Sequence, residues 1–221
     1  MARLCSVNVG SPQPNPYKRD PVATGIGKVP QRDPVEVRAP GPKRSGLGSG
    51  LVGDYIGDTR HHGGDGQAVY AFAREDLDRW QDRLDRELPN GFFGENLTTV
   101  GLDLADARIG ERWRVGDEVV LQVTSPRIPC ATFRGQLGEK GWLQTFTADG
   151  RPGAYLSVVR PGHLAADDPV EVLHRPDHDV SVALMFRAFT TERALLPALL
   201  PAGNDLEPET CAQIAAYQAG R

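Results

Sequence analysis

Three short stretches of the chain carry residue types that could do chemistry. The first is SPRIPC, residues 125–130, in which Cys130 directly follows Pro129 and lies shortly after Arg127. Proline fixes its own φ and donates no amide hydrogen, so the loop before Cys130 is stiff and can hold the sulfur at a set distance from a ligand. Arg127 can favour the thiolate, the form of cysteine that acts as nucleophile and metal ligand. The alternative interpretation is a buried, inert cysteine at the end of a strand.

The second stretch is RHHGGDGQAVYAF, residues 60–72, in which His61 and His62 precede two glycines. Adjacent side chains of an extended segment point to opposite sides, so at most one of the two histidines faces a given pocket. Histidine exchanges protons near neutral pH, which makes the inward-facing one a candidate proton donor. The alternative is that both are solvated turn residues. A zinc site shared with the distant Cys130 is a weaker hypothesis, because the spacing of the ligands does not indicate closure.

The third stretch is GFFGENLTTVGLD, residues 91–103. Asn96 precedes a run rich in β-formers and could donate from its side-chain amide to an anion or to an oxygen ligand. An asparagine that merely forms a turn is the alternative. The three stretches together offer a thiol, an imidazole and a carboxamide.

Short strands and tight turns must position these residues. The 221-residue chain contains 25 glycines and 18 prolines, and runs typical of strands recur at short spacing, which predicts a mainly β fold. Strands are expected at residues 2–9, 35–38, 119–124, 154–159 and 170–174. Residues 109–126 predict a hairpin that turns at 115–117, so SPRIPC would lie at the exit of a strand, where loops carry function.

Helical patterns occur in two regions. Residues 73–88 place leucines and a tryptophan on one stripe, which predicts a helix. After His174 the sequence predicts three short helices, with Thr190 as an N-cap and Pro208 in the first turn of the last helix. Segments 10–33 and 39–53 are rich in loop-forming residues. We place a boundary near Pro176, which divides the chain into a β domain (1–175) and a three-helix subdomain (176–221).

Composition restricts the function classes. The formal net charge of −4 gives no reason to expect a nucleic acid polymer as partner, because binding a polyanion usually requires a basic surplus. No apolar run approaches the ~20 residues that span a bilayer, and no signal peptide is recognisable. Three widely spaced cysteines without a CxxC pair argue against a disulfide framework. We therefore expect a cytoplasmic protein with free thiols and no membrane association.

In their order along the chain, these stretches resemble the MOSC family, which is named for the C-terminal domain of molybdenum cofactor sulfurase, and more narrowly its YiiM-like subfamily. The matching segments are VGDYIGDTRHHGGDGQAVYAF, GFFGENLTTVGLDLADARIGERWRVGDEVVLQVTSPRIPC and GRPGAYLSVVRPGHLAADDPVEV. The resemblance covers about residues 1–173, and the helical tail resembles the small appendix of that subfamily. It implies a barrel-like β fold and a pocket for the molybdenum cofactor, a pterin that carries a phosphate and a metal.

The resemblance also implies roles for individual residues. The family cysteine falls on Cys130, as metal ligand or sulfur acceptor, and the histidine and asparagine that accompany it fall on His62 and Asn96. Charge-assisted bonds to phosphate favour basic side chains, and those in or near the matching motifs are Lys28, Arg60, Arg127 and Arg151. Two departures stand out: Ser157 takes the place of a frequent family arginine, and the glycine-rich loop before GLVGD is long.

The leading hypothesis is a molybdenum-dependent oxidoreductase that reduces N-hydroxylated substrates such as N-hydroxylated bases. Cys130 would bind the metal, His62 would supply protons, and Asn96 would orient a metal oxygen or the substrate. No flavin, nicotinamide or iron–sulfur motif is visible, which implies a separate electron-donating reductase. The alternatives are a carrier of sulfur or cofactor that uses a Cys130 persulfide, and a non-catalytic anion-binding module. The family resemblance also suggests a homodimer.

Overall fold

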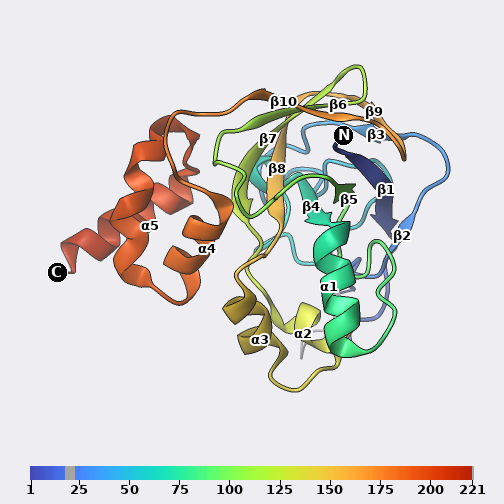
Figure 1. The fold of residues 1–221 in the computed structure, drawn as a ribbon, viewed down its shortest axis with the longest axis horizontal. Helices are drawn as coiled ribbons and strands as arrows, with labels where there is room; N and C mark the ends of the chain where they lie inside the picture. The colour runs from blue at the N-terminus through green and yellow to red at the C-terminus, as the bar shows by residue number, and fades with distance from the viewer. Residues whose placement is uncertain (18–22, 221) are drawn as a thin grey trace.

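The computed structural model describes residues 1–17 and 23–220, and a curved sheet of eight strands forms its centre (Figure 1). The strands are β1 Arg3–Gly10, β2 Lys28–Pro30, β3 Val35–Val37, β4 Val69–Ala73, β5 Leu97–Val100, β6 Arg112–Val115, β7 Val119–Pro126, β8 Ala154–Arg160, β9 Gly162–Leu164 and β10 Val170–His174. Their order in the sheet is β10-β6-β7-β8-β4-β5-β1-β2, and β3 pairs separately with β9. The β4–β5 pair is parallel, and β6, β7 and β8 form an antiparallel meander.

The sheet curls so that its first strand returns toward β10. An isolated bridge joins Arg3 to Pro169, and the amide of Val170 donates to the carbonyl of Ala2 at 2.9 Å. The ladder of the described strands runs from β10 to β2 and does not close. The predicted mainly β, barrel-like fold is confirmed in this open form.

The predicted hairpin is confirmed by the register of β6 and β7, in which Val115 faces Val119 and Trp113 faces Leu121. Val119, Leu121 and Val123 are completely buried, as strict alternation of apolar side chains on one face requires. β7 continues to Pro126, two residues past the predicted end at 124. The SPRIPC segment therefore begins with the last two residues of β7, Ser125 and Pro126, and leads out of the sheet.

The helices are η1 Asp65–Gln67, α1 Arg74–Leu84, α2 Ala131–Leu137, α3 Trp142–Asp149, α4 Val182–Thr190, η2 Arg193–Asp205 and α5 Pro208–Ala219. The predicted helix at 73–88 ends earlier, because Asp85 adopts a left-handed conformation with φ 49° that terminates α1.

The three C-terminal helices and the place of Pro208 in the first turn of α5 are confirmed. The N-cap prediction for Thr190 is wrong. Thr190 is the last residue of α4, where its hydroxyl donates to the carbonyl of Phe186 at 2.6 Å.

An aromatic cluster joins α1, α2 and α3 to the sheet at the lower end of Figure 1. Its largest completely buried members include Trp80, Trp142, Phe146, Phe93 and Phe133. Burying each such side chain contributes roughly 1.5–3 kcal/mol. Because Phe133 belongs to α2, the cluster anchors the turn that follows β7, and with it Cys130.

The C-terminal helices lie at one side of the sheet (Figure 1). Their buried residues, among them Met185 and Leu199, belong to the same apolar cluster as the strands. Arg108 fixes the connection between β10 and α4 by donating to the carbonyl of Pro176 at 2.6 Å and to Asp179 at 2.9 Å. The division into 1–175 and 176–221 stays a prediction.

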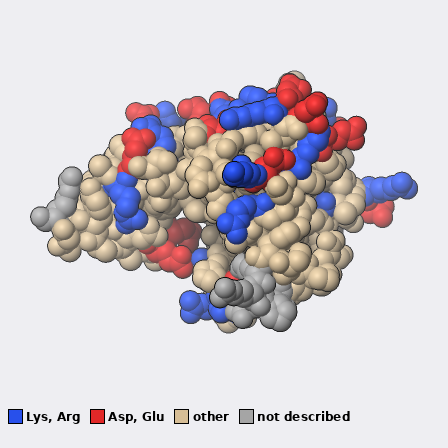
Figure 2. All heavy atoms as spheres, turned by 90° about the horizontal axis from the view of Figure 1, so that it is seen from below, with Lys and Arg blue, Asp and Glu red and all other residues tan. Residues whose placement is uncertain are grey.

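The segment 10–33, predicted as loop, contains the short edge strand β2, and residues 18–22 within it lie outside the described residues. On the face seen in Figure 2, lysine and arginine side chains are interspersed with aspartate and glutamate. Among the described helices, none has the length and apolar character needed to cross a bilayer.

Candidate functional site

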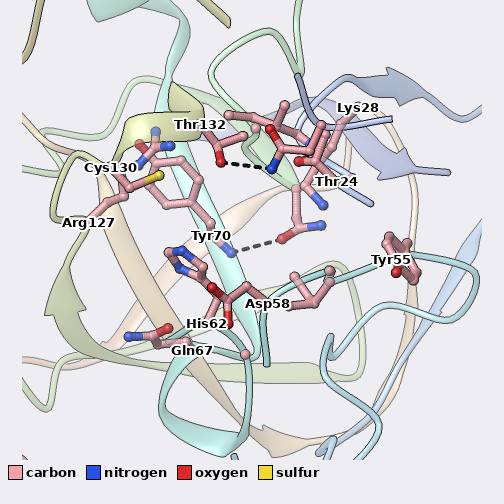
Figure 3. A pocket seen from close by; sticks show the side chains of 18 of the residues that line it. Thr24, Lys28, Tyr55, Asp58, His62, Gln67, Tyr70, Arg127, Cys130 and Thr132 are labelled. Carbon is pink, nitrogen blue, oxygen red and sulfur yellow. Dashed lines mark hydrogen bonds between the residues drawn. The ribbon is translucent and has the colours of Figure 1, made fainter. Parts of the chain in front are cut away.

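A pocket opens where the exit of β7 meets the loops before β2, β4 and β5 (Figure 3). The pocket and its mouth, which is open to solvent, together hold about 780 Å³ of space that no atom fills. The residues that line it are Asn15, Ala23, Thr24, Gly25, Ile26, Lys28, Tyr55, Ile56, Gly57, Asp58, His62, Gly63, Gln67, Tyr70, Gly94, Asn96, Arg127, Cys130, Thr132 and Tyr155. The structure thus brings together five of the seven predicted site residues: Cys130, His62, Asn96, Lys28 and Arg127.

Cys130 lies at the junction between β7 and α2, immediately before the first residue of that helix, and its sulfur points into the pocket (Figure 3). Burial raises the pKa of the thiol, but a hydrogen bond from His62 and the positive charge of Arg127 outweigh burial and lower the pKa from 9.0 to about 6. At neutral pH the sulfur is therefore mostly thiolate, which is the reactive and metal-binding form.

His62 reaches the pocket because the backbone turns sharply after it. Gly63 and Gly64 have φ of 79° and 80°, and a Cβ on Gly63 would lie 2.6 Å from the carbonyl oxygen of Gly48. Its neighbour His61 points outward and contacts Asp58, with Nδ1 and Oδ2 3.1 Å apart and 69% of its side chain exposed. One histidine of the pair therefore faces the pocket.

Asn96 is held by hydrogen bonds on both ends of its amide. Nδ2 donates to Oδ2 of Asp54 at 2.9 Å and to the carbonyl of Asn8 at 3.3 Å, while Oδ1 accepts from the amide of Tyr70 at 3.1 Å. Both amide hydrogens are thus engaged within the protein, contrary to the expectation that Asn96 donates to a ligand. The second lone pair of Oδ1 remains able to accept a hydrogen bond.

Asp54, which the sequence did not single out, organises this wall of the pocket. Its completely buried carboxylate accepts from Ser49 Oγ at 2.6 Å, from the Gly10 amide at 2.8 Å and from Asn96, and it forms an ion pair with Lys28. Lys28 is only 5% exposed at its side chain. Its charge is therefore matched by Asp54 and only partly available to a ligand.

Replacing Asp54 with asparagine should lower the free energy of unfolding by about 3–5 kcal/mol, because the buried ammonium of Lys28 loses its counter-charge. Denaturant unfolding measures the change. The matched control is Asp167→Asn, since Asp167 is 83% exposed in its pair with Arg3 and such pairs contribute little. Equal, small losses in both variants would contradict the role assigned to Asp54.

Arg127 is the buried cation at the base of the pocket. It is 6% exposed, donates to the carbonyl of Phe93 at 2.8 Å, and lies 3.8 Å from the ring centroid of Phe133. Among residues 1–17 and 23–220, no carboxylate pairs with it. A buried charge of this kind is costly unless an anion compensates it, and the nearby Cys130 thiolate or a bound anion can do so.

The other two predicted arginines lie outside the pocket lining. Arg60 has 61% of its side chain exposed and pairs with Asp58 at 3.3 Å. Arg151 donates to Asp76 at 2.7 Å and to Asp103 at 2.8 Å, so its guanidinium is occupied away from the site. The structure therefore gives no support for cofactor binding by either residue, and proximity to a motif in sequence did not predict proximity in space.

Two tyrosines that sequence reasoning missed complete the pocket. Tyr70 donates its hydroxyl to the carbonyl of Pro152 at 2.8 Å. Burial raises the pKa of Tyr155, so its phenol keeps its proton at neutral pH and is a further candidate proton donor. The motif GAYLSVV contained Tyr155, but its alternation resembled that of any half-buried strand.

Alkylation of Cys130 should follow a titration midpoint near pH 6, given its lowered pKa. Burial raises the pKa of Cys5, so at pH 7 iodoacetamide should label Cys130 much faster than Cys5. Peptide mapping by mass spectrometry after short exposures at several pH values measures both rates. A midpoint for Cys130 near 9 would show that His62 and Arg127 do not stabilise the thiolate.

The same shift predicts a pH-dependent stability. Because the folded-state pKa of Cys130 lies below its unfolded value, the thiolate stabilises the fold fully above pH 9, and this contribution disappears as the pH falls through about 6. Relative to Cys130→Ser, the unvaried protein should therefore gain stability between pH 6 and 9. The free energy of unfolding of both proteins is measured at several pH values. An equal change with pH in the two proteins would exclude the effect.

Comparisons with known proteins agree with this fold and this order of motifs. The family model for the MOSC domain matches residues 58–171. The uncharacterised protein YflK of Bacillus subtilis (strain 168) is 33% identical over 179 residues, which is 81% of this chain and 76% of that protein. Protein YiiM of Escherichia coli (strain K12) is 34% identical over 140 residues, 60% of either chain.

Two further comparisons are limited, one by the part of the relative that it covers and the other by its low sequence identity. A protein of Gibberella moniliformis (strain M3125 / FGSC 7600) named reductase is 29% identical over 132 residues, 58% of this chain but 23% of that protein. The crystal structure of YiiM from Geobacillus stearothermophilus superposes with a TM-score of 0.76 over 98% of both chains at 23% identity. At that identity the superposition describes the fold alone.

Proposed function

This chain belongs to the MOSC domain family, and from that premise we propose that it binds the molybdenum cofactor and reduces N-hydroxylated small molecules. The proposal depends mainly on the thiol of Cys130, which lines a pocket and has a pKa lowered to about 6. Beside it lies the buried Arg127, which has no carboxylate partner in the described part of the chain. A soft thiolate suits a molybdenum centre better than a site of oxygen ligands alone.

The residues of the pocket fit such a group. Within the described residues, no cluster of three or more His, Cys, Asp or Glu side chains could enclose a metal ion. Cys130 would thus be a single protein ligand, and the cofactor or solvent would supply the others. The buried positive charge of Arg127 favours an anion nearby, and Lys28 contributes a second, partly compensated cation.

The reaction converts R–NHOH to R–NH₂ and water with two electrons and two protons. The molybdenum cofactor, when bound, supplies the redox chemistry. His62 lines the same pocket as Cys130 and helps to lower the pKa of its thiol, and it would deliver a proton to the leaving oxygen, since loss of hydroxide is slow without an acid. Tyr155, which keeps its proton because burial raises its pKa, is a second candidate proton donor in the same pocket.

The electron donor is proposed to be a separate reductase. The likeness to a protein named reductase supports a redox role, although it covers 23% of that protein. The cytoplasmic location and the homodimer stay predictions.

An assay with purified protein tests the proposed function. The full chain, produced in a molybdenum-replete host, is supplied with reduced methyl viologen and an N-hydroxylated base, and the amine product is measured. We expect amine formation that depends on the protein. If no amine forms although the protein contains molybdenum, the proposed activity is excluded.

A second function is favoured by the same thiolate, which could carry sulfur as a persulfide. Mass spectrometry of the peptide that contains Cys130 distinguishes the two functions. An added sulfur atom on Cys130, together with absence of turnover, would favour the carrier.

A further inference from the structure

The C-terminal helices reach the loop that forms one wall of the pocket. Figure 3 shows the side chains of Asp58, His62 and Gln67 on one side of the pocket, and all three belong to this loop, residues 58–67. Neither the sequence motifs nor the proposed reaction gives the C-terminal helices a role. Yet the first turn of α5, which begins at Pro208, contacts the loop directly and through a lysine.

The direct contact is between Glu207 and Gly66. Glu207 is the N-cap residue of α5, but its side chain makes no capping hydrogen bond to that helix. A Cβ built on Gly66 would lie 2.8 Å from Cδ and Oε2 of Glu207 and 3.0 Å from Oε1, and these are the three atoms nearest to it. The carboxylate therefore rests on the backbone of Gly66, and the absence of a side chain at that position makes room for it.

The second contact runs through Lys43. Its Nζ lies 3.3 Å from Oε2 of Glu209, in the first turn of α5. The backbone of Lys43 packs against Gly64, where a Cβ would lie 2.6 Å from the Lys43 nitrogen. Lys43 thus connects α5 to the residue that follows His62 and Gly63. Because 76% of the Glu209 side chain is exposed, this ion pair contributes little by itself.

The sheet and a neighbouring loop also hold the backbone of residues 58–67. The Thr124 hydroxyl, on β7, donates to the carbonyl of Gly66 at 2.6 Å, and the amide of Gly64 donates to the carbonyl of Gly48 at 2.9 Å. Gly66 is therefore in contact with both β7 and α5. Since local stability falls where packing is lost, the loop without its contact to Glu207 would open more easily.

We propose that Glu207 is a positioning residue for the pocket. By resting on Gly66 it holds residues 58–67 in place, and it thereby fixes the imidazole of His62, which belongs to the same loop. This inference goes beyond the proposed function, because it concerns the wall of the pocket whichever ligand the pocket binds. It makes the first turn of α5 part of the functional site.

Hydrogen exchange of the full chain, followed by mass spectrometry, tests this role. In Glu207→Ala the amides of residues 58–67 should exchange at least about threefold faster than in the unvaried protein, because local opening becomes easier. Glu192→Ala is the matched control. Glu192 is an exposed acid of the C-terminal helices that pairs with Arg187 at 2.7 Å, and its loss should leave the exchange of residues 58–67 unchanged.

Gly66→Ala supplies a second, independent variant. Gly66 lies in η1 without a positive φ, so its backbone accepts alanine, and the added Cβ meets the carboxylate of Glu207 first. The exchange of residues 58–67 should again be faster. In the background of Glu207→Ala the same substitution should have no further effect, because the group that it displaces is already absent. If Glu207→Ala does not fold, Gly66→Ala by itself decides the test.

The NMR signals of the His62 ring separate positioning of the pocket from a merely structural contact. They are assigned by their loss in His62→Gln and recorded at one fixed pH. They should shift in Glu207→Ala and in Gly66→Ala, and they should keep their positions in Glu192→Ala.

Unchanged exchange of residues 58–67 in the folded variants, or an equal acceleration over all peptides of the chain, would overturn the proposal. Additive effects of the two substitutions, or His62 signals that do not move, would overturn it too. All these measurements are made without substrate, so absence of turnover would refute the proposed reaction and leave this inference standing.

Discussion

Replacing Cys130 with serine should lower turnover of an N-hydroxylated substrate by more than about 100-fold, because removing even the hydrogen-bonding partners of a metal ligand typically costs 10–100-fold. Serine keeps the size of the side chain, but its hydroxyl is a hard oxygen that stays protonated at neutral pH. The measurement is amine formation with reduced methyl viologen as donor.

Cys211→Ser is the matched control, since Cys211 is an exposed thiol on α5. It should retain the activity of the unvaried protein. Full activity in Cys130→Ser would contradict the assignment of the metal ligand.

Replacing His62 with glutamine should lower turnover by about 10²–10⁴-fold, the usual contribution of a positioned proton donor. The same change removes the hydrogen bond and the charge that lower the pKa of Cys130. The midpoint of Cys130 alkylation should therefore move upward from about pH 6, a readout that does not depend on bound cofactor.

His61→Gln supplies the control for this prediction. His61 is the adjacent histidine in sequence, yet it is 69% exposed and contacts Asp58 instead of the pocket. We expect near-normal turnover and an unchanged alkylation midpoint in that variant. Equal losses in both variants would mean that the loop, rather than the imidazole of His62, is needed.

Local rules predicted much of the site because several of its residues are placed by the backbone. Pro129 stiffens the backbone before Cys130, and two glycines let the chain turn sharply after His62. The side chains of Cys130 and His62 line one pocket. Alternation along β7 placed SPRIPC at the end of a strand. These features depend on neighbours in sequence, but local rules left the roles of Cys130 and His62 open, and the resemblance to the MOSC family selected them.

Other features depend on contacts between distant segments and were missed. Asp54 pairs with Lys28, 26 positions before it, and accepts from Asn96, 42 positions after it, and an isolated aspartate in a glycine-rich loop gives no sign of that role. Arg151 belongs to a matching motif, but the packing of α1 brings Asp76 to it and removes it from the pocket.

The helices α2 and α3 were also not predicted. They are short, and glycines with positive φ, among them Gly138, Gly141 and Gly150, precede or follow them. Their stability comes from the aromatic cluster around Phe133 and Trp142, and such tertiary packing overrides weak local propensity.

The molybdenum content of purified protein tests the central claim most directly. The full chain, Cys130→Ala and Cys211→Ala are produced side by side in a molybdenum-replete host and analysed for metal by mass spectrometry. The account predicts near-stoichiometric molybdenum in the unvaried protein and in Cys211→Ala, and a large loss in Cys130→Ala. Equal molybdenum in all three proteins, or none in the unvaried chain, would contradict it.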